Sequence, residues 1–264
     1  MSAILVPTLI IGGLGALCGI ILAVASVIMA VPVNERVEAI KGALPGANCG
    51  ACGFPGCDGF ANAVAAGNAP VNGCPPGGKD LAVALGAIMG VEAGNMARQT
   101  AVVHCNGCSD NTSEKMNYIG AASCIYAAQL YGGQSACSYA CLGLESCLKA
   151  CAYNAIRMVK GVAVIDPDLC VGCKLCIAAC PKAIIAMGPA EDVAVVACSN
   201  RDKGAVVRKL CSVGCIGCGL CVKACSEEAI VVENFLARID YSKCTGCQAC
   251  VAKCPQKTIR MVNC

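Results

Sequence analysis

One stretch decides the fold of this chain: Cys170-Val-Gly-Cys173-Lys-Leu-Cys176-Ile-Ala-Ala-Cys180-Pro181. Its spacing, C-x2-C-x2-C-x3-C-P, is typical of 4Fe-4S sites, because three thiolates on one tight loop bind one cube and the fourth binds a second cube. Tetrahedral zinc is the alternative, but zinc usually takes two separated C-x2-C pairs. The spacing therefore favours iron–sulfur. The same cysteine spacing occurs at Cys215, Cys218, Cys221 and Cys225, and at Cys244, Cys247, Cys250 and Cys254.

The composition supports a chain organised by metal rather than by a large apolar core. There are 27 cysteines in 264 residues, no Trp and three Phe. An odd number of cysteines in metal-ligand runs is poorly explained by a disulfide framework. The formal net charge is +3, without any Lys/Arg-rich run, so the sequence gives no support for a nucleic-acid partner.

The N-terminal segment is strongly apolar. Residues 3–34 contain no charged side chain, and the stretch from Leu5 to Val31 is rich in Ile, Leu, Val, Ala and Gly. A bilayer is spanned by about 20 apolar residues, whereas a signal peptide has a basic start and a shorter apolar core. Residues 1–33 are therefore predicted to be a single-pass transmembrane anchor in the inner (plasma) membrane. Arg36 and Lys41 follow the span, so the positive-inside rule places the soluble domains on the cytoplasmic side, where thiols also stay reduced.

A second cysteine pattern follows the anchor, with spacing C-x2-C-x4-C-x16-C. Glycines and prolines around it let the backbone turn tightly about a bulky ligand. Four cysteines without a partner run predict one self-contained 4Fe-4S domain over residues 34–100, with zinc as the alternative because the spacing is looser. Helices are expected over residues 34–44, 58–66 and 81–96. The predicted ligands are Cys49, Cys52, Cys57 and Cys74.

The remaining chain is an internal duplication with a period of 74 residues. Adding 74 takes nine cysteines to nine cysteines without a gap, for example Cys124 to Cys198, Cys137 to Cys211 and Cys170 to Cys244. Each copy is predicted to be an α+β two-cluster ferredoxin-like module. Its β-hairpin lies between the two cysteine loops, at residues 155–166 and 229–240. A helical turn is expected after each fourth cysteine.

The second module, residues 191–264, is regular, and each half lends its last cysteine to the other half. The first module, residues 101–190, departs from the pattern because Leu144 stands where the second has Cys218. Cys137, four residues before Cys141, is predicted to supply the missing thiolate, with a three-iron cluster as the alternative. The predicted ligand sets are Cys137, Cys141, Cys147 and Cys180; Cys151, Cys170, Cys173 and Cys176; Cys215, Cys218, Cys221 and Cys254; and Cys225, Cys244, Cys247 and Cys250.

These sets give about five 4Fe-4S clusters and leave several cysteines over. A sixth cluster at Cys105, Cys108 and Cys124 with one later thiolate is one interpretation, and buried small apolar side chains are the other. Cys198 and Cys211 are also unassigned, and Cys18 and Cys264 are expected to bind nothing. His104, the single histidine, is expected at a strand end facing solvent or a carbonyl.

No second chemistry is visible in the sequence. There is no G-x-G-x-x-G run opening a βαβ unit and no P-loop, and one histidine cannot supply a Ser/His/Asp set. A chain whose chemistry is confined to one-electron centres is expected to relay electrons and to have no substrate-converting site of its own.

The order of these features resembles the B subunit of the Rnf complex, the ion-translocating ferredoxin:NAD+ oxidoreductase of bacteria. The residues around Cys49 to Cys57 carry the most specific part of the resemblance, and Ser138-Tyr-Ala-Cys141-Leu-Gly-Leu144 resembles the long form with extra ferredoxin modules. The resemblance implies that the chain accepts electrons from reduced soluble ferredoxin and passes them to the membrane subunits and other subunits of the complex. It also implies that NAD+ is reduced on another subunit and that Na+ or H+ is pumped.

Two other functions are compatible with the cysteine motifs. One is a relay subunit of a different membrane oxidoreductase. The other, from a different class, is a scaffold that gives up its clusters, although fully ligated paired loops argue against labile sites.

Removal of iron provides a first test of the fold. Since the sequence offers few large apolar side chains, we expect the metal-free protein to be largely unfolded, as in other small metal-dependent domains. Circular dichroism of the chelator-treated protein should show loss of native secondary structure. A spectrum equal to that of the iron-loaded protein would contradict this expectation.

Overall fold

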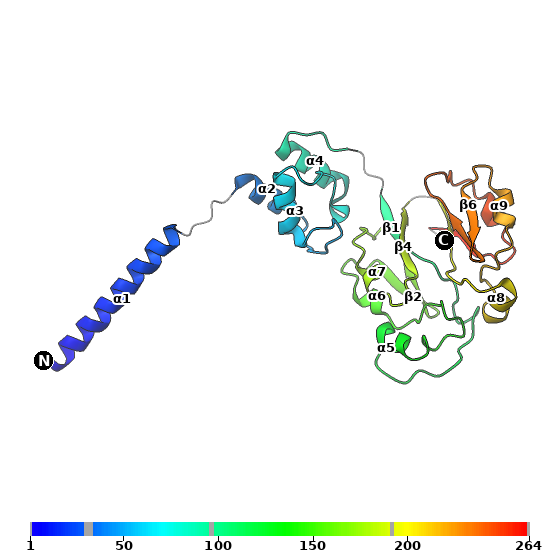
Figure 1. Cartoon of the computed structure of the whole chain (residues 1–264), viewed down its shortest axis with the longest axis horizontal. Coiled ribbons are helices and arrows are strands. Elements are labelled where there is room, and N and C mark those ends of the chain that lie inside the picture. Colours follow the sequence, from blue (N-terminus) through cyan, green and yellow to red (C-terminus); the bar gives the residue numbers. More distant parts are fainter. Residues whose placement is uncertain (1, 29–33, 95–97, 191–192, 263–264) are drawn as a thin grey trace.

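The computed structural model describes residues 2–28, 34–94, 98–190 and 193–262, and in the first helix it describes side chains only for residues 12–26. That helix, α1 (Ser2–Ile28), lies apart from the other elements in Figure 1. The predicted span from Leu5 to Val31 extends beyond the described side chains at both ends. Among the described residues, no helix has the length and apolarity needed to cross a membrane.

Three helices and a short 3-10 turn follow, around the first cysteine pattern. They are α2 (Glu35–Ala43), α3 (Gly56–Ala65), η1 (Pro75–Gly77) and α4 (Gly78–Met89). The Asn34 side chain caps α2 by accepting the backbone N–H of Arg36 at 3.0 Å. Ile40, Phe60 and Leu85 form the centre of a small core between these helices.

The helix predicted over residues 81–96 is shorter than expected at its C-terminal end. It ends at Met89 because Gly90 adopts the left-handed conformation, with φ of 69°, and its N–H caps the carbonyl of Gly86. Residues 95–96 of that prediction lie outside the described residues.

The first ferredoxin-like module consists of two small antiparallel sheets and short helices (Figure 1). Strand β1 (Gln99–Val103) pairs with β4 (Ile185–Pro189), and β2 (Ile156–Val159) pairs with β3 (Val162–Ile165) as the predicted hairpin. The helices are α5 (Cys124–Gln129), α6 (Ser146–Lys149) and α7 (Leu175–Ala178).

The second module repeats this plan. Strand β5 (Ala194–Val196) pairs with β8 (Ile259–Met261), and β6 (Ile230–Glu233) pairs with β7 (Leu236–Ile239). Its helices are α8 (Gly204–Leu210), α9 (Leu220–Ala224) and α10 (Ala249–Lys253). Ile156 pairs with Ile165 in one hairpin and Ile230 with Ile239 in the other, so the 74-residue shift also holds in the strand register.

The helical turns sit one cysteine earlier than predicted. Each of α6, α7, α9 and α10 contains the third cysteine of its run, and the fourth cysteine follows the helix. Prolines 181 and 255 follow two of these fourth cysteines and disfavour helical geometry at the residue before them. Two of the fourth cysteines, Cys225 and Cys254, adopt an extended backbone directly after their helices.

Cysteine side chains form a large part of both module cores. Cys147 and Cys176 pack with Ile156 and Ile185 in the first module, and Cys221 and Cys250 pack with Ile230 in the second. All the cysteines within the described ranges are free thiols.

A substitution at Gly217 can test how tightly the first cysteine loop of the second module packs against the hairpin of that module. It has φ of 66°, and a Cβ atom there would lie 2.8 Å from the backbone oxygen of Phe235. Gly219 has φ of 72° but open space around it, which makes it the matched control. We expect Gly219→Ala to cost about 1–2 kcal/mol through left-handed strain alone, and Gly217→Ala to cost about 1–3 kcal/mol more through the backbone clash.

The measurement is thermal unfolding of the iron-loaded variants, followed by the absorbance of the clusters. Equal melting temperatures for the two variants would show that the approach to Phe235 does not constrain the loop.

Candidate metal centres

Site 1 is the set formed by the first cysteine pattern. The backbone N–H of Cys57 donates to the Asn48 side-chain oxygen at 2.8 Å, which closes the loop that begins before Cys49. Burial, opposed by a hydrogen bond from the Gly77 backbone, raises the pKa of the Cys74 thiol, and the charges of the other three thiols add to the rise. The structure thus gathers these thiols into one group. Site 1 consists of Cys49, Cys52, Cys57 and Cys74.

Site 2 belongs to the first module and surrounds a cavity with about 330 Å³ of empty space, part of it open to solvent. Cys170 and Cys173 come from the loop before α7, Cys176 from the helix itself, and Cys151 from the turn after α6. Burial and the charges of Cys170 and Cys173 raise the pKa of the Cys176 thiol to about 12. The lining cysteines of site 2 are those predicted from the spacing: Cys151, Cys170, Cys173 and Cys176.

Site 3, the other cavity of this module, also has a volume of about 330 Å³. Cys124 reaches it because its backbone N–H donates to the Ser146 hydroxyl at 2.9 Å, which holds the start of α5 against the start of α6. Burial, together with the charges of Cys141, Cys124 and Cys180, raises the pKa of the Cys147 thiol to about 11. The cysteines that line site 3 are Cys124, Cys141, Cys147 and Cys180.

The structure separates Cys137 from the cysteines with which the sequence analysis groups it. Proximity in sequence to Cys141 predicts that Cys137 replaces the thiol missing at Leu144, whereas Cys124, and not Cys137, lines the cavity of site 3. The Cys137 sulfur instead accepts a hydrogen bond from the Asn200 side chain at 3.3 Å, on the side of the second module.

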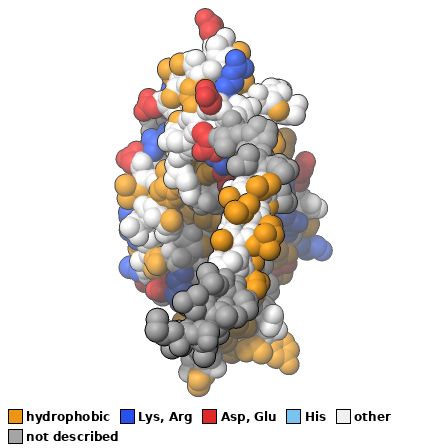
Figure 2. Space-filling view, turned by 90° about the vertical axis from the view of Figure 1, so that its left-hand side faces the viewer, with side chains coloured by type: hydrophobic (Ala, Val, Ile, Leu, Met, Phe, Trp, Pro, Cys, Tyr) orange, Lys and Arg blue, Asp and Glu red, His pale blue; other side chains and the backbone are white. Residues whose placement is uncertain are grey.

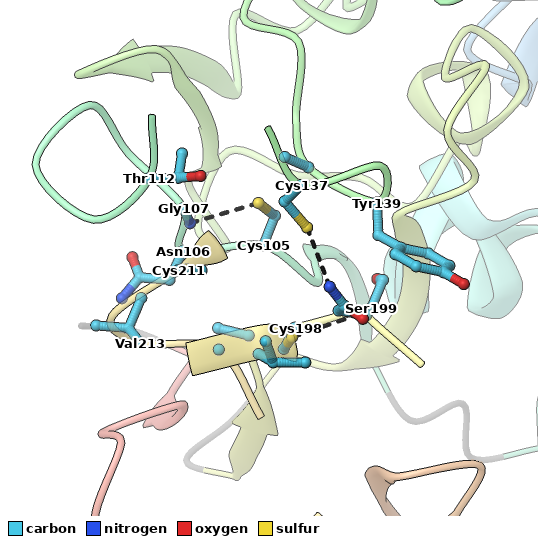
Figure 3. Close-up of a pocket in the computed structure, with 15 residues that line it drawn as sticks. Cys105, Asn106, Gly107, Thr112, Cys137, Tyr139, Cys198, Ser199, Cys211 and Val213 are labelled. Carbon is cyan, nitrogen blue, oxygen red and sulfur yellow. Dashed lines mark hydrogen bonds between the residues drawn. The ribbon is translucent and has the colours of Figure 1, made fainter. Parts of the chain in front are cut away.

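The structure also does not bring together the three cysteines of the sixth grouping suggested from sequence. Cys105 and Cys124 line different cavities, and Cys108 lines neither; its sulfur accepts a hydrogen bond from the Asn111 side chain at 3.2 Å. Four cysteines line a separate cavity of about 360 Å³ between the modules, which we call site 4 (Figure 3). They are Cys105, Cys137, Cys198 and Cys211.

The second module contains sites 5 and 6. Site 5 surrounds a cavity of about 350 Å³ and follows the predicted set: Cys215, Cys218, Cys221 and Cys254. In site 6, burial and the charge of Cys244 raise the pKa of the Cys250 thiol, and Cys247 adds to the rise. The repeat equates site 6 with site 2, position by position, through Cys225, Cys244, Cys247 and Cys250.

The donor sets of these sites fit a 4Fe-4S cube. Within the described ranges, no three His, Cys, Asp or Glu side chains converge as ligands of one metal ion. A 4Fe-4S cube needs a wider arrangement, because each thiolate binds a different iron. Four cavities of similar volume, each lined by four thiols and mostly apolar neighbours, provide that arrangement.

Backbone N–H groups point at several of the sulfur atoms. Ala101 donates to Cys170 at 3.4 Å, and Thr258 donates to Cys254 at 3.3 Å. Such bonds stabilise negative charge on the sulfur and tune the reduction potential of a cluster. Because metal coordination deprotonates a thiol outright, burial of these groups favours loading with metal over free thiolates.

His104 lines none of the four cysteine-lined cavities. Its ring nitrogen lies 2.8 Å from the carbonyl oxygen of Val196, which agrees with the prediction that it faces a carbonyl. Burial lowers its pKa, so the neutral ring is favoured. The histidine therefore ties the end of β1 to β5 rather than binding metal.

The fold and these sites define an iron–sulfur electron-transfer protein with tandem two-cluster domains. Residues 44–76 match an Fe-S cluster domain family. Two families described as 4Fe-4S dicluster domains match residues 137–184 with 214–258, and residues 162–226.

Full-length relatives narrow this class further. The B subunit of the Na(+)-translocating ferredoxin:NAD(+) oxidoreductase complex of Acetobacterium woodii is 43% identical over 244 residues, covering 92% of this chain and 73% of the relative. The B subunit of the ion-translocating oxidoreductase complex of Methanosarcina acetivorans is 40% identical, covering 92% and 93%. The B subunit of the proton-translocating ferredoxin:NAD(+) oxidoreductase complex of Clostridium ljungdahlii is 38% identical, covering 92% and 86%. The chain belongs to the family of B subunits of Rnf-type ion-translocating oxidoreductase complexes.

The exchange between Cys124 and Leu144 gives a direct test of site 3. We expect Cys124→Ala to lose about four iron atoms per chain, which is one 4Fe-4S cluster. Adding Leu144→Cys to that variant should restore the iron, because residue 144 corresponds to Cys218, the loop ligand of site 5.

Iron and sulfide quantification of anaerobically purified protein measures both effects. Cys108→Ala is the control and should keep the wild-type content, since Cys108 lines none of the cavities. Full iron content in Cys124→Ala would refute the assignment of Cys124 to site 3.

Proposed function

We propose that the chain is the membrane-anchored electron relay of an Rnf-type complex, accepting electrons from reduced soluble ferredoxin and passing them to membrane partners. The observation that carries this proposal is the arrangement of thiols in neighbouring sets of four. When bound, 4Fe-4S clusters exchange single electrons, and the residues of this chain hold them, shield them and set their spacing. The names of the relatives support ion pumping and NAD+ reduction by the whole complex.

We assign five clusters of this relay to sites 1, 2, 3, 5 and 6. The ligands are the residues that form each set, with Cys124 in place of Cys137 at site 3.

The sites lie next to one another in an order that suits a relay. The Lys174 side chain, from the loop of site 2, donates to the carbonyl oxygen of Ala51, in the loop of site 1, at 3.5 Å. The loops of sites 1 and 2 therefore lie side by side. Sites 2 and 3 share one module core, and Cys147 and Cys176 both belong to it. Electrons can therefore pass from site 1 through site 2 to site 3 within one continuous part of the chain.

The N-terminal segment is proposed to be the membrane anchor. Residues 3–34 lack any charged side chain, and the described part of α1 exposes Leu14, Ile20 and Leu22 by 59%, 62% and 69%. Figure 2 shows apolar side chains along this helix. Apolar side chains exposed on a single helix are expected to be covered by lipid or by other subunits. Arg36 and Lys41 support placement of the clusters on the cytoplasmic side.

A groove between the site 1 region and the first module suits an acidic electron donor. Lys79, Arg98 and Lys174 line it, and none of the described residues that line it carries a carboxylate. Cys170 of site 2 also lines the groove, so a docked donor lies close to a cluster. Soluble ferredoxins are generally acidic, and complementary charge increases association rates.

Ferredoxin-dependent reduction tests this function. We expect reduced ferredoxin to bleach the visible absorbance of the iron-loaded chain, and the rate to fall as salt screens the charges. Lys174→Glu should slow this reduction, because Lys174 is exposed and lines the groove. Lys223→Glu, an equal charge change on α9 in the second module, is the matched control and should have a smaller effect.

Stopped-flow absorbance measures the rates. No reduction of the wild-type protein by ferredoxin would contradict the relay, and transfer of iron to an apo-acceptor protein would favour a scaffold instead. Equal slowing by both substitutions would place the docking site outside the groove.

A further inference from the structure

We propose that site 4 holds a 4Fe-4S cluster of its own and that this cluster joins the two ferredoxin modules. The cavity lies where the lead-in segments of the modules meet, and Figure 3 shows the Cys105, Cys137 and Cys198 side chains around it.

The size and lining of site 4 agree with those of the recognised sites. The empty space at site 4, about 360 Å³ including the part open to solvent, compares with about 350 Å³ at site 5 and about 330 Å³ at sites 2 and 3. Cys105 and Cys137 are buried, with exposed fractions of 7% and 8%. Four thiols around a mostly apolar cavity of this size form the same donor set that the two-cluster motifs build elsewhere in the chain.

Hydrogen-bond donors already point at the sulfur atoms of site 4. Asn200 is almost fully buried, at 1% exposed, and its side-chain N–H donates to the Cys137 sulfur at 3.3 Å while its backbone N–H donates to the Cys198 sulfur at 3.4 Å. Its side-chain oxygen is satisfied separately by the backbone N–H of Asp202 at 2.7 Å. The side-chain and backbone amides of this buried residue, each donating to one thiol, stabilise negative charge on the two sulfur atoms.

Gly107 allows the backbone to approach two more of the sulfur atoms. A Cβ atom at this position would lie 3.6 Å from the Cys105 sulfur and 3.8 Å from the Cys211 sulfur. The backbone N–H of Gly107 donates to Cys105 at 3.4 Å. The loop therefore runs past both thiols and places an amide, rather than a side chain, beside them.

The duplication explains how these four thiols became available. Cys137 and Cys211 occupy equivalent positions of the two copies, and Cys198 is equivalent to Cys124. In the second copy Cys218 supplies the fourth thiol of site 5. Cys198 is therefore not needed there, unlike its counterpart Cys124 in site 3. With site 4 included, sets of four account for all cysteines except Cys18, Cys108 and Cys264.

Site 4 lies directly between a site of each module. The backbone N–H of Cys141, a site 3 residue, donates to the Cys105 sulfur at 3.4 Å. The Cys198 thiol has a hydrogen bond with the backbone of Cys215, a site 5 residue. One hydrogen-bonded contact therefore links site 4 to each neighbour.

The surrounding hydrogen bonds hold the modules together at this place. The Ser199 hydroxyl donates to the carbonyl oxygen of His104 at 2.9 Å, and the Thr112 hydroxyl donates to that of Leu210 at 2.8 Å. The backbone N–H of Ser212 donates to the Asn111 carbonyl at 2.9 Å. The segments that carry Cys105, Cys198 and Cys211 are thus fixed relative to one another.

Iron content tests the assignment in the full chain. Fully loaded wild-type protein should contain about 24 iron atoms per chain, and Cys105→Ala and Cys211→Ala should each contain about 20, since one 4Fe-4S cluster is lost. Cys108→Ala is the control and should keep the wild-type value. Unchanged iron and sulfide in both site 4 variants would overturn the proposal.

Asn200→Ala keeps the test decisive if the cysteine variants fail to fold. Loss of a donor to Cys137 should lower the reduction potential of one paramagnetic signal and leave the other signals unchanged. A redox titration in which every signal keeps its wild-type potential would overturn the contact between Asn200 and a cluster ligand.

The joining role rests on the proposed relay function and has its own readout. The Cys211→Ala protein is mixed with reduced ferredoxin and followed by rapid freeze-quench paramagnetic resonance. The clusters of one module should be reduced at the normal rate, and those of the other module many-fold more slowly. The signals are assigned to modules with Cys124→Ala and Cys218→Ala. Equal rates of reduction on both sides of site 4 would refute the joining role. If ferredoxin cannot reduce the wild-type chain, the relay function is refuted. The iron content of the variants then decides whether site 4 holds a cluster.

Discussion

Burial of cysteine thiols is the constraint on which the rest of this structure depends. In each module the third cysteine of a run packs among the isoleucines of the hairpins, so the ligand is also a core residue. Burial of a thiol raises its pKa, and binding to iron removes the proton while keeping the sulfur in place. The proposed clusters therefore supply the bonds that would come from large apolar side chains in an ordinary domain of this size.

Local spacing predicted those parts of the sites that a single loop determines. The triples Cys170, Cys173 and Cys176, and Cys244, Cys247 and Cys250, follow from tight turns in which the residue before the helix takes a positive φ, as at Lys174 and Gln248. The hairpins and their register also followed from the 74-residue repeat. These features depend on neighbours in sequence, so the sequence alone was enough to predict them.

The ligands contributed from a distance were harder to predict, because the lead-in segments have no regular spacing. Closeness in the chain predicts that Cys137 joins Cys141, whereas Cys124 from α5 lines the cavity of site 3 with Cys141. The hydrogen bond from the Cys124 backbone N–H to the Ser146 hydroxyl holds Cys124 at this site. It joins residues 22 positions apart. The repeat held a usable signal, since Cys124 and Cys198 are equivalent and only the second copy has Cys218.

That single difference between the copies has a consequence for the whole molecule. In the first copy the lead-in thiol Cys124 completes a site inside its own module, whereas in the second copy Cys218 makes Cys198 available to the space between modules. A cluster at site 4 takes Cys105 and Cys137 from one lead-in segment, and Cys198 and Cys211 from the other. The bonds that would carry electrons across the boundary are then the same bonds that set the spacing of the two modules. The rate of electron transfer falls steeply with distance. Bonds from both modules to one cluster would therefore fix the distance between sites 3 and 5 more closely than an apolar contact between the modules.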